Sequence, residues 1–336
     1  MEKKKIIIIG AGLSGIYLAY LLQDKYDITI LEARDRIGGR IFSINSNDLG
    51  PSWICSHQKN ILSLIQKLGL ELFSQYTRGY ALYDTKDKVE LFTAPPSAPS
   101  ARLKGSLTKL IDTLKEKLYN TNILLSQEVT DIKEDNYFVH VSSKTKTYKA
   151  HYLISTLPHR ITANLKFEPQ LPNRLISKML ATPTWMANSA KCVIEFKTAF
   201  WVEKSLSGFV FSNLGPIGEM HDASHDDTAA LFGFINSNAD MKDVKQNIKN
   251  QLIRLFDINE DEILNIYLLD WKKEKYTASL SDIKPLSTHP SYGIHTSEYS
   301  NKIFFSSTEF SFIEGGYLEG AVIQAQNLAL QLSSQS

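Results

Sequence analysis

The chain has 336 residues, of which 43% are hydrophobic and 22% are charged, with 37 basic and 36 acidic side chains. This composition predicts a packed globular protein of about two domains and excludes a disordered chain. The formal charge of +1, without a basic block, argues against nucleic-acid binding as the main task, because neutralising phosphates needs clustered Lys and Arg. Two cysteines cannot form a disulfide framework, so we expect a reducing compartment and a cytoplasmic location.

The N-terminal region predicts a strand, a turn, a helix and a second strand. A β-branched run at 5–9 is typical of a parallel strand buried on both faces, the residues to 22 continue as a helix, and 27–31 form the next strand. Three lysines before the apolar run imitate a secretory signal, but the glycines within that run and the lack of a cleavage site favour the strand-turn-helix interpretation. No other stretch is long enough for a membrane span, so we expect a soluble protein.

The rest of the chain continues with mixed helices and strands. Apolar spacing predicts helices over 61–68, 107–118, 244–255 and 320–332. Strands are expected at 137–141, 148–154, 191–196, 208–212, 229–235 and 302–306. Ser106 is a plausible N-cap for the second helix of this series, and the proline-containing residues 91–105 are interpreted as a connection.

A glycine motif joins the first strand to the first helix, Gly10-Ala11-Gly12-Leu13-Ser14-Gly15. Gly10 makes the tight turn, Gly12 lets the backbone approach a pyrophosphate, and Gly15 lets helix and strand pack closely. The helix N-terminus then faces the phosphates, and Glu32 at the end of the next strand accepts hydrogen bonds from a ribose. We therefore predict a dinucleotide site rather than a glycine turn with an incidental glutamate.

The residues after Glu32 narrow the choice of dinucleotide. The run Leu31-Glu32-Ala33-Arg34-Asp35-Arg36-Ile37-Gly38-Gly39-Arg40 permits a close backbone approach and charge-assisted contacts to a pyrophosphate; the alternative is a solvated loop. Together with Asp48-Leu49-Gly50-Pro51-Ser52-Trp53, it resembles the flavin-containing amine oxidase family. That family includes monoamine oxidases, polyamine oxidases, L-amino-acid oxidases and lysine-specific histone demethylases. The resemblance implies an α/β fold, in which a Rossmann-like FAD-binding domain is interleaved with a smaller α+β substrate domain.

The resemblance recurs towards the C-terminus and covers most of the chain. Two segments, 304–309 and 315–322, resemble the strand and the helix start that this family places beside the flavin, where the helix dipole can stabilise an anionic reduced ring. Val129, Trp271 and Tyr276 are similar to family residues near the adenine and the flavin. The implied cofactor-binding residues are Gly10, Ala11, Gly12, Leu13, Ser14, Gly15, Glu32, Ala33, Arg34, Gly38, Gly39, Arg40, Gly50, Pro51, Ser52, Trp53, Val129, Trp271, Tyr276, Thr308, Glu309, Gly316, Tyr317, Leu318 and Ala321.

Two residues are predicted to be catalytic, Lys191 and Tyr317. Lys191 begins a strand that is followed by a Phe-Trp pair, and in the family a Lys at this position holds a water against flavin N5; the alternative is a strand-edge Lys in solvent. Tyr317 would place a ring beside the flavin, with core packing as its alternative. The second Tyr of the family's aromatic cage would fall near Leu280 or Ser281, so the cage is incomplete or is closed by Trp185, Trp201 or Tyr292.

Further departures from the family pattern shape the predictions. Segment 270–320 contains no cysteine, so we expect FAD to be bound non-covalently; Cys55 and Cys192 are interpreted as small buried side chains. The acidic and histidine cluster at 221–227 lacks recognised ligand spacing, and no metal site is predicted. The stretch between Trp53 and Lys104 is short, so the roof of the substrate site is small or is completed by another subunit.

These observations predict an FAD-dependent oxidoreductase of two interleaved domains. The FAD-binding domain is assigned to 1–56, 101–158 and 285–336, and the substrate domain to 57–100 and 159–284. The resemblance implies hydride transfer from a small amine to flavin N5, an imine product, and reoxidation by O2 to H2O2. The alternatives are oxidation of a non-amine (renalase-like NAD(P)H oxidation or desaturation), a plain NAD-dependent dehydrogenase, and a flavin-bound interaction subunit without turnover. Neither nucleic acid nor a membrane is an expected partner, and the oligomeric state stays open.

Overall fold

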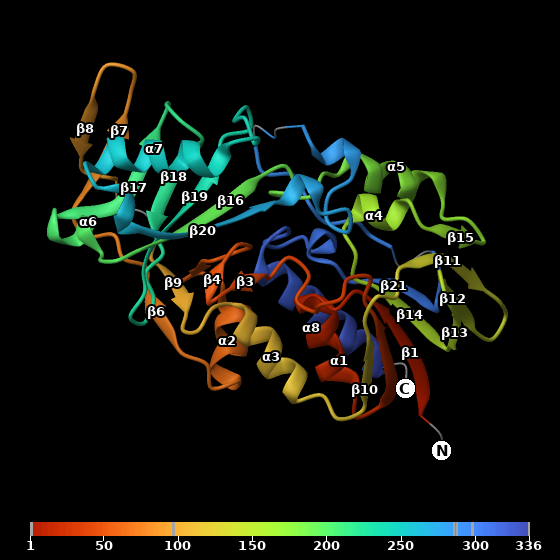
Figure 1. The fold of residues 1–336 in the computed structure, drawn as a ribbon. Helices are drawn as coiled ribbons and strands as arrows, with labels where there is room; N and C mark the ends of the chain where they lie inside the picture. Colours follow the sequence, from red (N-terminus) through yellow and green to blue (C-terminus); the bar gives the residue numbers. More distant parts are fainter. Residues whose placement is uncertain (1–2, 96–97, 285, 287, 297–298, 335–336) are drawn as a thin grey trace.

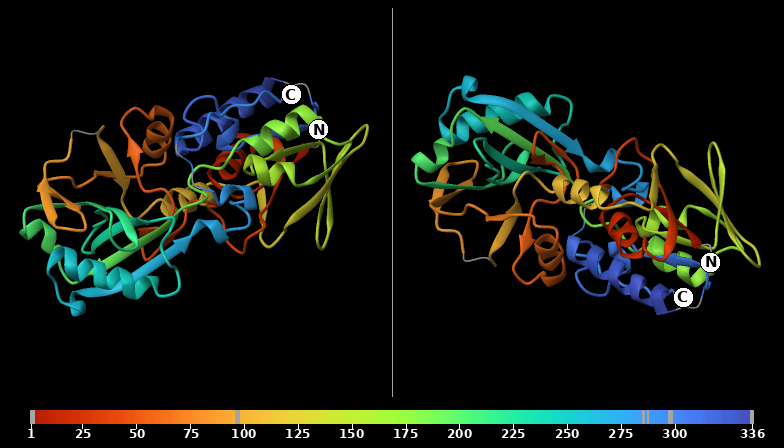
Figure 2. Two further views of the ribbon diagram at one scale, coloured as in Figure 1. Left: turned by 90° about the horizontal axis from the view of Figure 1, so that it is seen from above. Right: turned by 90° about the horizontal axis from the view of Figure 1, so that it is seen from below.

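The computed structural model describes residues 3–95, 98–284, 286, 288–296 and 299–334. Two lobes lie side by side, and both ends of the chain belong to the same lobe (Figures 1 and 2). In the described part of the chain, none of the helices combines the length and the apolar character that crossing a membrane requires.

The first lobe is built on a five-stranded parallel sheet with the order β10-β2-β1-β14-β21. Its strands are β10 (Thr121–Leu124), β2 (Tyr26–Leu31), β1 (Lys4–Ile9), β14 (Tyr152–Ser155) and β21 (Ile303–Phe305). Ile6 to Ile9 are buried because β1 lies at the centre and both of its faces are covered. Strands far apart in the sequence therefore share one sheet, as an interleaved domain requires.

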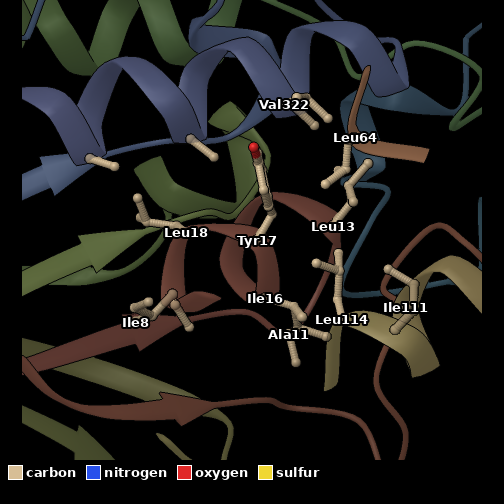
Figure 3. Packing of buried hydrophobic residues seen from close by; sticks show 14 of the residues in the cluster. Ile8, Ala11, Leu13, Ile16, Tyr17, Leu18, Leu64, Ile111, Leu114 and Val322 are labelled. Atoms are coloured by element: carbon tan, nitrogen blue, oxygen red, sulfur yellow. The ribbon is translucent and has the colours of Figure 1, made fainter. Parts of the chain in front are cut away.

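Four helices cover one face of this sheet: α1 (Leu13–Leu22), α2 (Lys59–Lys67), α3 (Thr108–Glu116) and α8 (Leu318–Ser334). Side chains of α1 meet Val322 of α8, Leu64 of α2 and Leu114 of α3 (Figure 3). The other face packs on a four-stranded sheet and two helices. Those elements are β11 (Val129–Glu134), β12 (Val139–Ser143), β13 (Thr147–Ala150), β15 (Lys166–Glu168), α4 (His159–Ala163) and α5 (Asn173–Ala181).

The second lobe is a seven-stranded sheet with the order β20-β16-β19-β18-β17-β7-β8. Its strands are β20 (Ile263–Asp270), β16 (Ala190–Phe196), β19 (Ala229–Ile235), β18 (Ile217–Asp222), β17 (Leu206–Ser212), β7 (Tyr80–Asp84) and β8 (Val89–Phe92). The helices α6 (Phe200–Glu203) and α7 (Val244–Phe256) pack on one face. The opposite face carries Phe232 and Val193, which pack on Leu49 and Trp53 of the first lobe's chain.

The remaining elements are short. They are the pair β3 (Ser43–Ile44) and β4 (Asn47–Asp48), the sheet β5 (Ile54–Cys55), β9 (Ser100–Leu103) and β6 (Leu72–Ser74), and the single turns η1 (Glu260–Glu262), η2 (Trp271–Lys273), η3 (Leu280–Asp282) and η4 (Thr308–Phe310).

Most of the expected helices and strands are present, but three local predictions are wrong. Residues 91–105 contain β9 and the end of β8, so they are more than a connection. The expected strand 148–154 is two strands, β13 and β14, which belong to different sheets. Ser106 is not the N-cap of α3, since it has φ +75°, and the N–H of Leu107 is instead bound by the Asp48 carboxylate at 3.0 Å.

The packing also divides the chain differently from the predicted domain boundaries. Ile61, Leu64 and Ile65 of α2 belong to the core formed by α1, α3 and α8, although 57–100 was assigned to the substrate domain. Leu175 and Met179 of α5 likewise pack against the other face of the five-stranded sheet. Apolar spacing identified these helices but could not show which core each of them joins.

Candidate active site

One cavity of about 1110 Å³ begins at the carboxyl ends of β1, β2 and β14 and continues to the inner face of the seven-stranded sheet. Ligands of open parallel sheets bind at this edge, beyond the ends of the strands. The volume suits a dinucleotide together with a small second molecule.

The nucleotide end of the cavity is shaped by two glycine segments that lie against each other. Gly38 donates its N–H to the carbonyl of Ala11 at 2.8 Å, and Gly12 is bridged to Gly38. A Cβ on Gly15 would lie 2.1 Å from the carbonyl oxygen of Gly10, so helix α1 can approach β1 only with glycine there. The cradle has the open backbone surface and the helix N-terminus that a pyrophosphate requires.

Glu32 lies on the cavity wall with its carboxylate already held. One oxygen accepts the N–H of Ala11 at 2.8 Å, and the other accepts the N–H of Arg34 at 2.9 Å. These two bonds orient the buried carboxylate at the end of β2. It is therefore in place to receive a ribose hydroxyl.

Two arginines at this end are each paired with a carboxylate from a distant segment. Arg40 donates to Glu309 at 2.6 Å, and Arg34 donates to Glu274 at 3.0 Å. Burial alone would raise the pKa of Glu309, but the adjacent charge and hydrogen bond of Arg40 outweigh burial and lower it. Glu309 thus stays ionised and holds the guanidinium at the cavity wall.

Nearly all predicted cofactor-binding residues line the cavity: Gly10, Gly12, Leu13, Ser14, Glu32, Ala33, Arg34, Gly38, Gly39, Arg40, Gly50, Pro51, Ser52, Trp53, Val129, Trp271, Tyr276, Thr308, Gly316, Tyr317, Leu318 and Ala321. Three do not reach it. Ala11 and Gly15 lie behind the glycine turn, and Glu309 lies behind Arg40. In the described structure these three position other groups and form no part of the cavity wall.

The start of α8 is fixed by Thr308. Its hydroxyl donates to the carbonyl of Tyr317 at 2.7 Å and accepts the N–H of Gly316 at 3.0 Å. Gly316 has φ +85°, a conformation that favours glycine. The N-terminal turn of α8 lies at the cavity wall, where Leu318 and Ala321 line it, and the positive end of a helix dipole favours an anionic group there.

Lys191 is buried on β16 at the junction between the two ends of the cavity. Its ammonium donates to the carbonyl of Gly50 at 2.8 Å and to the hydroxyl of Ser52, and it lies 4.3 Å from the ring centre of Phe232. Burial lowers its pKa from 10.5 to about 7, with Asp48 opposing that shift. An amine with a pKa near neutrality can both hold and release a proton at physiological pH.

Aromatic side chains from three segments of the chain gather at the cavity wall. Tyr317 and Trp185 line the cavity, and the ring of His289 lies between them, parallel to Tyr317 at 5.0 Å and 4.8 Å from Trp185. The hydroxyl of Tyr292 accepts the N–H of Trp185 at 2.8 Å. Trp185 and Tyr317 thus both line the cavity and share His289 as a neighbour, while Tyr292 holds the backbone of Trp185 and does not itself line the cavity.

Three other residues considered for the aromatic cage do not line the cavity. Leu280 is 89% exposed, and Ser281 does not line the cavity. Trp201 is buried in the core on the far face of the seven-stranded sheet, where its indole donates to Asp222 at 3.0 Å. The sequence showed that this ring follows a strand, but it could not show on which face of the sheet the ring packs.

Several lining residues were missed by the sequence analysis, notably Glu219, Phe232 and Phe234. Alternation along β19 puts both phenylalanines on one face, and that pattern could have identified them as a pair. Nothing local distinguishes Glu219 from an exposed strand residue, because its place depends on the neighbouring strand.

The cysteines and the 221–227 cluster have other partners. Cys192 donates to the carbonyl of Gly233, and burial raises its pKa to about 12, so it stays a thiol. Cys55 is only partly buried and lines the cavity. His221 pairs with Glu219 at 2.6 Å, and among the residues with described positions no three His, Cys, Asp or Glu side chains are arranged to hold a metal ion.

The comparisons with known proteins identify the family of the chain. The model of the family "Flavin containing amine oxidoreductase" matches residues 13–107 and 81–332. The chain belongs to this family. It is therefore a flavin-dependent oxidoreductase of amines, and the α/β fold prediction is confirmed.

Curated relatives in the family are larger than this chain. Flavin-containing amine oxidase B of Mus musculus is 25% identical over 453 aligned positions, covering 98% of this chain and 86% of the relative. Amine oxidase A of Canis lupus familiaris is 23% identical, covering 97% and 84%. Since the aligned stretch exceeds the 336 residues of this chain by more than a hundred positions, the relatives carry segments that it lacks.

Solved structures share the fold at low sequence identity. A putrescine oxidase bound to putrescine superposes with a TM-score of 0.82 at 17% identity, covering 99% of each chain. Cyclohexylamine oxidase from Brevibacterium oxydans gives 0.82 at 18% identity, again with 99% of each chain. These likenesses show that this chain shares the overall fold of the two proteins.

Proposed function

We propose that this chain oxidises the C–N bond of a small amine to an imine. Oxidation of the neutral amine to the imine removes two electrons and two protons, the C–H hydrogen with its electron pair as a hydride and one N–H hydrogen as a proton. Non-covalent FAD would supply the electron-accepting ring, and O2 would take up the two electrons and two protons as H2O2. The observation that carries the proposal is the position of Lys191, whose buried ammonium lies in the cavity wall between the glycine cradle and the aromatic group. A cation with a pKa near 7 at that junction suits proton movement during oxidation of an amine.

FAD supplies the electron-accepting ring when it is bound, and this chain's residues hold and orient it. The cradle at Gly10, Gly12 and Gly38 offers backbone surface for the pyrophosphate, and Glu32 offers a carboxylate for the ribose. Arg40, held by Glu309, adds a positive charge. Non-covalent binding is supported by the absence of cysteine from segment 270–320.

The substrate end would bind the amine in its neutral form. Trp185 and Tyr317 provide ring faces on one wall, and Phe232 and Phe234 provide an apolar surface on the inner sheet face. Burial among these rings excludes water and favours an unprotonated amine, whose lone pair is needed for the reaction. Lys191 lies close enough to this surface to exchange a proton with a water or product.

Anaerobic mixing of the flavin-loaded protein with candidate donors tests the proposal. The panel contains primary amines, polyamines, amino acids and NAD(P)H, and the flavin absorbance is followed. We expect an amine to bleach the flavin and O2 to restore it with H2O2 formation. Bleaching by NAD(P)H alone would contradict amine oxidation, and flavin that stays on the acid-precipitated protein would contradict non-covalent binding.

A further inference from the structure

Glu219 lies in the cavity without a use in the reaction proposed above. We propose that the substrate carries a second cationic group, and that Glu219 binds that group while the other amine reacts near Lys191. This inference rests on the proposed function and names the class of amine: a linear diamine or polyamine rather than a simple monoamine.

The strand register places Glu219 and Lys191 on the same face of the seven-stranded sheet. Lys191 of β16 pairs with Phe234 of β19, and Phe234 pairs with Glu219 of β18. Directly paired residues point to the same face, so the three side chains form one row across three strands. Because neighbouring strands are about 4.8 Å apart, the backbones of Lys191 and Glu219 are separated by about 10 Å.

The surface between these two charges is apolar. Phe232 and Phe234 alternate along β19, both line the cavity, and the ring of Phe232 is packed against the Lys191 ammonium. An aliphatic chain that crosses this surface would bury its methylene groups on the two rings. The row therefore has a proton-exchanging end, an apolar middle and an acidic end.

The balance of charges in the cavity wall singles out Glu219. Among the described lining residues, the other carboxylates have basic partners: Glu32 lies 3.9 Å from Arg34, and Glu128 lies 2.6 Å from Lys144. Glu219 is paired with His221 alone, through one oxygen at 2.6 Å. Within the described structure its second oxygen accepts no hydrogen bond, and 41% of the side chain is exposed.

His221 fixes the direction of this carboxylate. The imidazole stacks on Phe209 at 4.8 Å and meets the edge of Trp53 at 4.8 Å, so the ring is held by its neighbours. With one oxygen held by His221, the other is free for an ammonium, which forms charge-assisted hydrogen bonds with carboxylates. Glu219 is thus a pre-oriented anion without a Lys or Arg partner, facing the cavity.

The test compares matched pairs of substrates in wild type and variants. The pairs are α,ω-diamines and n-alkylamines of equal carbon number, from four to eight carbons, and the quantity is the ratio of their kcat/KM values. We expect wild type to favour the diamine, and Glu219→Gln to reduce the ratio by about ten- to a hundredfold, as for loss of a charged hydrogen bond. Glu219→Asp should move the preferred diamine to a longer chain, because the carboxylate is withdrawn by one methylene.

Glu90→Gln is the matched control, since Glu90 is a glutamate on β8 of the same sheet, outside the cavity. It should leave the ratio unchanged. Calorimetric binding of 1,6-diaminohexane and hexylamine to anaerobic protein measures the same preference without turnover. Suppose that amines reduce the flavin, but that the diamine-to-monoamine ratios of kcat/KM and of binding affinity are the same in wild type and Glu219→Gln. The inference is then overturned and the proposed function stands. If binding depends on Glu219 but no amine reduces the flavin, the cation site is supported and the proposed function fails.

Discussion

The two ends of the cavity are built in different ways. The nucleotide end comes mainly from residues 9–40, one strand-helix-strand unit, with backbone groups and glycines as its principal surface. The substrate end is assembled from β16, β18, β19, the loop at 185–189 and the start of α8. A cofactor common to many proteins is held by local backbone geometry, whereas the substrate surface depends on side chains that tertiary packing brings together.

Charge also differs between the ends. Arg34, Arg40 and Glu128 at the nucleotide end are each paired with a group of opposite charge. Lys191 and Glu219 at the substrate end have no such partner among the described Lys, Arg, Asp and Glu side chains. Paired charges stabilise a surface, and unpaired charges remain available to a ligand or a proton.

The largest effect is expected at the nucleotide end, from Gly15→Ala. The added Cβ would lie 2.1 Å from the Gly10 carbonyl and would push α1 away from β1. We expect loss of flavin absorbance from the purified protein and a loss of about 3 kcal/mol in the free energy of unfolding. Gly69→Ala is the control: Gly69 has φ +69° with no atom near its Cβ position, so it should cost about 1 kcal/mol and keep its flavin. A flavin-loaded Gly15→Ala protein would contradict the close-packing argument.

Lys191→Met should separate chemistry from cofactor binding. We expect kcat to fall by about a hundredfold or more, as for loss of a proton-transferring group, with flavin content retained. An ionisation near pH 7 in the wild-type rate profile, from the lowered pKa of Lys191, should disappear in the variant. A variant that turns over like wild type, with the same pH profile, would remove Lys191 from the mechanism.

The Lys191 variant also has a signature in stability. The pKa of this amine is 10.5 in the unfolded chain and about 7 in the folded protein, so between these values the unfolded chain binds more protons. Wild-type stability should therefore rise with pH across that window, and this contribution to the slope should be absent from Lys191→Met.

A smaller effect is expected from His159, which lies behind the nucleotide end. Burial lowers the pKa of His159 from 6.5 to about 4. Between these pH values the imidazole is protonated in the unfolded chain and neutral in the folded protein. Wild type should thus lose about 2.5 kcal/mol of stability between pH 7 and 4.5, within a limit of about 3.5 kcal/mol for the whole shift at about 1.4 kcal/mol per pKa unit. His159→Asn should lack this loss in urea titrations at pH 7 and 4.5. Equal acid sensitivity of the two proteins would show that His159 is accessible to protons.

The smallest effect is expected at the aromatic wall. Trp185→Ala removes an indole that lines the cavity, and we expect KM for the amine to rise by about tenfold from the lost ring contact. Trp185→Phe retains a ring and should recover most of the affinity. If both variants bind substrate like wild type, the amine does not contact this wall.

The sequence predictions were accurate where structure depends on local neighbours and inaccurate where it depends on tertiary packing. The glycine motif, Glu32 and the helix at 107–118 were predictable because each depends on neighbours within a few residues. Ser106 failed as a cap because Asp48, far away in the sequence, binds the N–H of Leu107. The prediction of a single strand at 148–154 was wrong because its two halves pair with strands of different sheets. Trp201 and Trp185 are both aromatic residues near β16, and only the fold shows that Trp185 reaches the cavity.

By itself, the sequence determined that this protein has a dinucleotide cradle, because turn geometry and a strand-helix-strand pattern are local properties of the backbone. It also determined the family, through motifs at both ends of the chain. The tertiary structure decided the rest: α2 and α5 join the first lobe, Glu309 acts through Arg40, and Phe234 separates Lys191 from Glu219. Strand register sets these last relations, and register depends on pairing between residues that no local pattern connects.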